Sequence, residues 1–128
     1  MILNLIRNIF KPVLNFRRQK PIDKASIKRQ WQEIESLMRL TGASHFEKAI
    51  IRGDKLVNHI MDLRGARGET FADRVRDFRK EFSDYSGLWQ AHILRNKIVH
   101  EPEFEVYKFM ADKAIKNFKR ALEDLRVL

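Results

Sequence analysis

The chain contains no cysteine, and this absence removes several classes of chemistry at once. Without thiols it can form no disulfide framework, no thiolate nucleophile and no cysteine-based zinc site. Any chemistry must therefore come from histidine, carboxylate, hydroxyl or basic side chains. A reducing compartment fits this composition, and we expect a cytoplasmic protein.

Long hydrophobic runs are also missing. The longest uncharged stretch near the N-terminus is residues 1–6, and Arg7 and Lys11 interrupt the apolar residues after it. A membrane-spanning helix needs ~20 apolar residues, so none is expected there. We expect no secretory signal either, because no charged segment precedes the apolar residues and no small-residue cleavage site comes after them.

The residues that are present suffice for one domain. A chain of 128 residues with 44% hydrophobic residues can build a single core. Residues 1–24 contain six basic residues and one acidic residue, and so hold +5 of the net charge of +9. The rest of the chain carries the remaining +4, a moderately basic charge that is compatible with RNA as a partner. It lacks the dense stripe of Lys and Arg expected of a dedicated nucleic-acid module.

Residues 1–22 are predicted to form a basic amphipathic helix and a linker. Apolar residues recur there at steps of four and three, namely Ile2, Ile6, Ile9, Val13 and Phe16. Its apolar face and flanking basic residues suit residues 1–18 to an anionic membrane surface, at the inner face of the membrane. Packing on the bundle or on a partner subunit is equally compatible with amphipathicity.

All the regular elements predicted for residues 23–128 are helices. Apolar periodicity indicates a helix from Asp23 or Ser26 to residue 40 and further helices over residues 44–64, 70–82, 88–101 and 108–125. No segment has the pattern of a strand. With short connections, this pattern favours an all-α domain, an antiparallel four-helix bundle with the N-terminal amphipathic helix added to it. The last helix should bury Phe109, Ala111, Ala114, Phe118, Ala121, Leu122 and Leu125.

Local signals predict where these helices begin and end. Ser44 and Glu47 have the spacing of a capping box, and Thr70 is expected to cap the third of these helices. Pro102 disfavours helical geometry in the residue before it, so the helix over 88–101 should stop there. His100 is therefore expected in a last helical turn.

Residues 95–100 hold the one constellation with evident chemistry. They place a permanent cation, an amide and an imidazole within two helical turns. Asn96 and His100 are four residues apart and share a face, whereas Arg95 is about 140° from His100 around an ideal helix. Arg95 would reach the same site through its long side chain or a loosened last turn.

These residue types suit the cleavage of RNA. RNA supplies its own nucleophile, the 2′-hydroxyl, so cleavage needs a proton acceptor or donor and a cation for the developing phosphorane charge. His100 and Arg95 fill these two roles, and Asn96 could orient the phosphate or the ribose. The chemistry requires no metal and no cofactor.

The motif resembles one from a known family. An Arg, an Asn directly after it and a His five residues after the Arg resemble the R-X4-6-H motif of the HEPN superfamily. The segments LWQAH at 88–92 and RNKIVHE at 95–101 are similar to uncharacterised bacterial HEPN-like proteins, in which patterns like AIIRGDKL at 49–56 and GET at 68–70 recur. The resemblance covers roughly residues 27–128.

The resemblance implies a metal-independent endoribonuclease, often part of a toxin–antitoxin or phage-defence system. Arg95 and His100 would be catalytic, and Asn96 would be the polar residue that commonly follows the Arg. Two protomers would face their motifs across a dimer cleft. The implied partners are RNA, a second copy of the chain, and an antitoxin or other protein.

A non-catalytic interpretation stays open beside this one. Arg95 could pair with Asp54 in the facing helix, and His100 could cap its own helix or pair with Glu101 or Glu103. The chain would then be a helical interaction module that binds protein or RNA, held at the membrane surface by residues 1–18.

Other candidate residues are assigned to the scaffold. His92 lies on one stripe with Asn96 and His100, but it is eight residues and so ~12 Å from His100, too far for both to ligate one metal. Trp31 and Trp89 have the spacing of core residues, which favours packing over base stacking.

Overall fold

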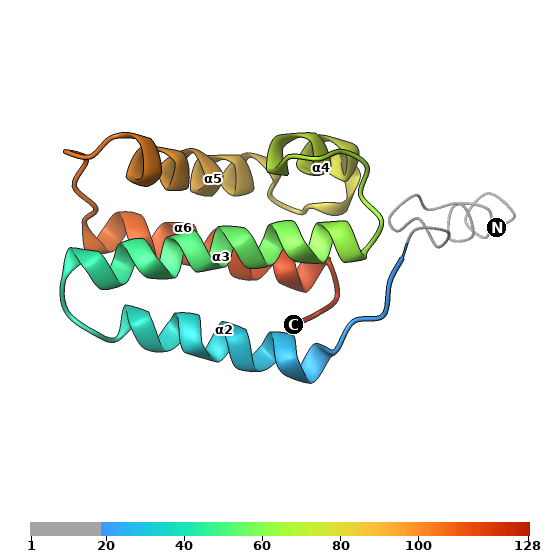
Figure 1. The fold of residues 1–128 in the computed structure, drawn as a ribbon, viewed down its shortest axis with the longest axis horizontal. Coiled ribbons are helices and arrows are strands. Elements are labelled where there is room, and N and C mark those ends of the chain that lie inside the picture. The colour runs from blue at the N-terminus through green and yellow to red at the C-terminus, as the bar shows by residue number, and fades with distance from the viewer. Residues whose placement is uncertain (1–18) are drawn as a thin grey trace, which may run out of the picture.

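The computed structural model describes residues 19–128, all of whose regular elements are helical (Figure 1). The elements are α2 (Lys24–Met38), α3 (Ala43–Leu63), α4 (Phe71–Asp77), the 3-10 turn η1 (Arg79–Glu81), α5 (Tyr85–His100) and α6 (Lys108–Asp124). The all-α prediction is therefore confirmed for this part of the chain. The amphipathic helix and the membrane contact predicted for residues 1–18 lie outside the described residues.

Helix α3 is the centre of the arrangement. It packs against α2, α4, α5 and α6, and α6 packs in turn against α5. Figure 1 shows α2 and α5 on opposite sides of α3, with α6 behind α3 and the short α4 over one end of it. Because α3 and α6 are covered from several sides, their inner faces form the core, including Ile50, Val57, Ile60, Phe118 and Leu122.

Side-chain caps fix the starts of three helices. Asp23 accepts a hydrogen bond from the backbone N–H of Ser26 (3.1 Å), and Thr70 accepts one from that of Asp73 (3.0 Å). The cap predicted at Thr70 is confirmed, and of the two starts predicted for the first helix, Asp23 and Ser26, the structure has Asp23. Each cap satisfies a donor that the first turn leaves free. A cap absent from the prediction is Asp84, which starts α5 three residues earlier than expected.

The predicted capping box at Ser44 is wrong. Helix α3 begins at Ala43, and its N-cap residue Gly42 makes no side-chain hydrogen bond. Gly42 has a φ of 109°, a backbone conformation that glycine adopts without steric cost. The tight turn after α2 thus starts the helix earlier than the Ser44 side chain would have done.

The third predicted helix is shorter than its periodicity indicated. Helix α4 stops at Asp77, although Phe78 and Phe82 beyond it are buried as expected. Asp77 accepts a hydrogen bond from the backbone N–H of Arg67 (2.8 Å), and Ser83 is held by Asp124 of α6 (2.8 Å). These contacts from distant segments end the helix, and sequence periodicity does not contain them.

The predicted burial of Phe109 is also wrong, because its side chain is 70% exposed. Ala111, Ala114, Phe118 and Leu122 are buried as predicted. At 100° per residue Phe109 lies about 200° around α6 from Ala111, so it projects from the opposite face.

Among the described residues, no helix is both long and apolar enough to cross a membrane.

Candidate functional site

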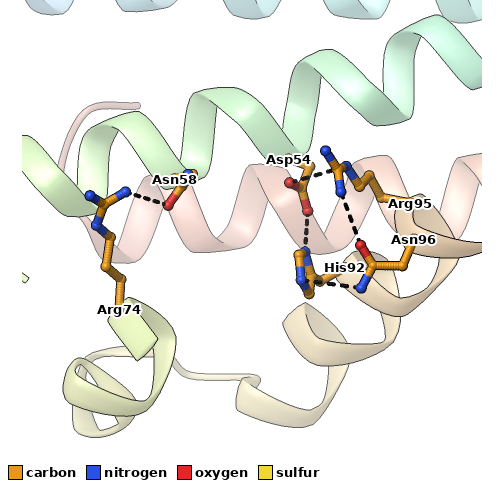
Figure 2. Close-up of polar contacts among 6 residues, drawn as sticks. All are labelled: Asp54, Asn58, Arg74, His92, Arg95 and Asn96. Atoms are coloured by element: carbon orange, nitrogen blue, oxygen red, sulfur yellow. Dashed lines mark hydrogen bonds and ion pairs between the residues drawn. The ribbon is translucent and has the colours of Figure 1, made fainter. Parts of the chain in front are cut away.

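A buried hydrogen bond links the middle of α3 to α5. The Nδ1 atom of His92 lies 2.6 Å from Oδ2 of Asp54 (Figure 2). Asp54 is 5% exposed and His92 8% exposed, so water solvates neither side chain well. A carboxylate at such a depth is costly unless it is paired, and His92 supplies the partner.

Arg95 and Asn96 close this pair into a ring of four side chains (Figure 2). The Nε atom of Arg95 lies 3.8 Å from Oδ1 of Asp54, and its Nη1 donates a hydrogen bond to Oδ1 of Asn96 (3.0 Å). The Nδ2 atom of Asn96 in turn lies 3.4 Å from Nε2 of His92. The His92 proton on Nδ1 then faces Asp54, and Nε2 accepts from Asn96.

The ring carries compensating charges. Arg95 is a permanent cation and the Asp54 carboxylate lies beside it, with the Arg95 side chain 32% exposed. The Nε atom of Arg95 is shielded from water and has no hydrogen-bond partner, since its contact with Asp54 is an ion pair at longer range. Two of the three guanidinium nitrogens therefore face the ring, and Nη2 makes no hydrogen bond or ion pair with the described residues.

Aromatic rings hold the imidazole of His92 in place. The Phe71 ring stacks on it with a centroid separation of 3.9 Å and an interplanar angle of 4°. Trp89, three residues earlier on α5, meets it edge-on at 6.0 Å. Because Phe71 is the first residue of α4, the Thr70 cap that starts α4 also positions the ring against His92.

A second set of polar contacts joins α4 to α3 next to the ring of four side chains (Figure 2). Arg74 donates to the side-chain oxygen of Asn58 (2.9 Å) and lies 3.5 Å from a carboxylate oxygen of Asp62. It also donates to the backbone carbonyl of Gly68 (3.1 Å). Every guanidinium nitrogen of Arg74 is thus engaged with α3 or with the loop before α4 and is not free for a ligand.

His100 is placed apart from the ring. It is the last residue of α5, and its exposed side chain makes no hydrogen bond or ion pair within residues 19–128. The pairing with Glu101 or Glu103 that the sequence left open is not formed. An open, shallow pocket formed by residues 100–104 lies at this helix end.

The structure thus brings together only two of the three predicted site residues. Arg95 and Asn96 are in contact, and Arg95 also makes the predicted alternative pairing with Asp54. His100 lies one helical turn beyond Asn96, about 6 Å along the axis. Within one chain, the exposed imidazole and the anchored guanidinium are neighbours on α5 without touching.

His92 is the site residue that sequence reasoning missed. The sequence assigned it to the scaffold, because it lies too far from His100 for both to ligate one metal. The described residues contain no group of three or more histidine and acidic side chains that could hold a metal ion. The usable signal was the spacing of His92 and Asn96, four residues apart, opposite an acidic residue inside the apolar face of α3. Its pairing with Asp54 depends on how α3 and α5 pack.

Comparison of the chain with models of known protein families, with curated protein sequences and with solved structures finds no match.

Proposed function

We propose that the four long helices constitute a four-helix bundle of HEPN type and that the protein is a metal-independent endoribonuclease. The observation that carries the proposal is that α5 holds both an exposed His100 without a side-chain partner and, five residues before it, a guanidinium that Asp54 and Asn96 hold in place. An acid or base must be free to exchange protons, whereas a phosphate-binding cation gains from being positioned in advance.

In this mechanism the RNA 2′-oxygen attacks the adjacent phosphorus and the bond from phosphorus to the 5′-oxygen breaks. The imidazole of His100 takes the proton of the 2′-hydroxyl, and a protonated imidazole returns one to the leaving 5′-oxygen. Arg95 stabilises the extra negative charge of the phosphorane through its outward nitrogen. The products are a 2′,3′-cyclic phosphate and a 5′-hydroxyl, so no metal ion is needed.

A homodimer would supply both imidazoles. Two exposed apolar side chains, Ile93 (49% exposed) and Phe109 (70% exposed), flank a groove between α5 and α6. Phe104 lines both this groove and the pocket at His100. A second copy docked on the groove would therefore place its own α5 end close to His100, one imidazole acting as base and the other as acid.

Substitution of Phe109 tests the dimer. Phe109→Glu places a charge on the exposed apolar patch without disturbing the core, so the variant should be monomeric and folded while the wild-type chain is dimeric. Sedimentation equilibrium measures the mass, and Lys116→Glu, an exposed position on the same helix that does not line the groove, serves as the control. A wild-type chain that is monomeric at high concentration contradicts the two-protomer site.

The cleavage experiment uses the wild-type chain, Arg95→Ala and His100→Ala with a mixed RNA pool in EDTA. We expect cyclic phosphate ends from the wild type and from neither variant. His59→Ala is the matched control, because His59 lies on α3 and its exposed side chain has no hydrogen bond or ion pair with the rest of residues 19–128. Circular dichroism of all four proteins separates loss of catalysis from loss of folding.

A specific observation also favours the second function, a non-catalytic interaction module. The charge of Arg95 is already compensated by Asp54, which is what a purely structural arginine requires. Absence of cleavage by a folded wild-type dimer, together with a large loss of stability in Arg95→Ala, would support this function.

The biological setting is proposed from the same resemblance. As a toxin or defence nuclease, the protein would arrest growth when produced alone, and a protein antitoxin would relieve the arrest. Growth of cells that produce the wild type or His100→Ala distinguishes nuclease toxicity from other causes.

Flotation of the full chain with anionic vesicles tests the membrane contact proposed for residues 1–18.

A further inference from the structure

The N-terminal part of α5, before the proposed catalytic residues, carries two aromatic rings, each with an arginine over it. Tyr85 and Trp89 are both half-buried and meet edge-on at 6.2 Å. The guanidinium carbon of Arg79 lies 4.9 Å from the Tyr85 centroid, and that of Arg76 lies 5.3 Å from the Trp89 centroid. We call these four residues the arginine–aromatic face.

This face is continuous with the candidate site. Tyr85, Trp89, His92 and Asn96 come at steps of four, three and four, so they lie on one side of α5. Trp89 also meets His92 edge-on at 6.0 Å, which joins the face to the ring that anchors Arg95. From Tyr85 to His100 the helix extends about 22 Å at 1.5 Å per residue.

Both arginines are exposed and weakly held. Arg76 lies 3.9 Å from Asp73 one turn earlier, and both side chains are more than half exposed, so the pair contributes little stability in water. Two nearby acidic residues are already hydrogen-bonded to backbone N–H groups, Asp77 to Arg67 and Asp84 to Gly87. The arginines are therefore available to a ligand, unlike Arg74.

A guanidinium on an aromatic ring is a combination that favours single-stranded nucleic acid. A base can stack on the ring or between the ring and the guanidinium, because each has a flat face, while the positive charge attracts the phosphates. A purely structural role does not require two exposed arginines over two successive half-buried rings of one helix.

We propose that the arginine–aromatic face binds single-stranded RNA by base stacking and directs the strand along α5 towards Arg95 and His100. The proposal rests on the proposed ribonuclease function and assigns the part of the surface that selects an unpaired strand. Double-stranded RNA keeps its bases stacked on each other, so the face discriminates against it.

Fluorescence of Trp89 gives a direct test, because the chain has only two tryptophans. Trp31 is 3% exposed and its Nε1 atom makes no hydrogen bond with residues 19–128, so Trp31→Phe removes its signal without breaking one. The ligand is an oligonucleotide of about ten 2′-O-methyl nucleotides, a length in the range of single-strand binding sites. It lacks the nucleophilic hydroxyl and cannot be cleaved by the proposed mechanism.

We expect saturable quenching of Trp89 in the full-length Trp31→Phe chain. Adding Arg76→Gln and Arg79→Gln should weaken binding about tenfold or more, since stacking and phosphate contacts are both lost. Lys28→Gln with Arg29→Gln is the matched control, because it removes two exposed cations from α2, which lies across the molecule from α4 and α5 (Figure 1). The control should bind like the parent chain.

The outcomes separate this proposal from the ribonuclease proposal. Equal weakening in the two double variants, binding without quenching, or full competition by inorganic polyphosphate of equal charge would each overturn base stacking on this face. Quenching that only the Arg76 and Arg79 substitutions weaken, with no cleavage of ordinary RNA, would support the face and contradict the nuclease. Cleavage that the same substitutions leave unchanged would support the nuclease and contradict the face.

Discussion

The imidazole of His92 and the carboxylate of Asp54 lie 2.6 Å apart between α5 and α3, both almost fully shielded from water. The same carboxylate faces Arg95, so one buried acid organises two basic side chains of the next long helix. A buried carboxylate is costly in any arrangement that leaves it without its partners. This contact therefore fixes both the register of α5 against α3 and the direction of the Arg95 side chain.

Asp54→Ala should strongly destabilise the protein. It leaves His92 and the shielded Nε of Arg95 without their partner, and we expect a loss of about 3 kcal/mol in the free energy of unfolding. Urea denaturation measures it. Asp112→Ala breaks an exposed ion pair with Lys108 and should cost under ~1 kcal/mol, so similar losses in both variants would contradict the role given to Asp54.

His100→Ala should separate activity from stability. The side chain is exposed and makes no hydrogen bond or ion pair within residues 19–128, so the free energy of unfolding should change by less than about 0.5 kcal/mol. Loss of an acid–base group should lower the rate of RNA cleavage by about 100-fold or more. Urea denaturation and single-turnover cleavage measure the two quantities, and an active variant would remove His100 from the mechanism.

Gly53→Ala should destabilise although alanine is the better helix former. A Cβ atom at position 53 would lie 2.7 Å from Cδ2 of Phe118, which is fully buried in α6. The propensity gain of about 1 kcal/mol is then outweighed by overpacking of about 1–3 kcal/mol. Thermal denaturation measures the change, and Phe118→Leu in the same chain should recover part of it if the clash is the cause.

Tyr107 should titrate above the usual range. Its hydroxyl donates a hydrogen bond to Glu105 (2.9 Å), and that bond, with the negative charge of Glu105, raises the pKa of Tyr107 by disfavouring the phenolate. Glu105→Gln should therefore lower this pKa towards its ordinary value. The ultraviolet absorbance of the phenolate reports the titration, with Tyr85→Phe present so that Tyr107 is the only tyrosine. An unchanged titration would mean that the contact does not form in solution.

Most of the helices could be predicted from apolar periodicity and capping residues. The final helix is predicted over 108–125 and observed as Lys108–Asp124, and Thr70 caps the helix that it was predicted to cap. The first helix starts at Asp23, one of its two predicted starts. These features depend on residues close in sequence, where side-chain spacing and backbone hydrogen bonding obey local rules. Helix α4 ends before its predicted last residue where a contact from the distant α6 holds Ser83, whereas the errors at Ser44 and Phe109 concern local geometry.

The candidate site shows the same division. The sequence alone determined that Arg95, Asn96 and His100 share one helix and that His100 lies in its last turn, because helical geometry fixes such spacings. Only the tertiary structure decided that Asp54 anchors Arg95, that His92 belongs to the same ring and that His100 stays exposed. Those facts depend on how α3 and α5 pack, and this packing brings together side chains 38 residues apart whose desolvation only the whole fold determines.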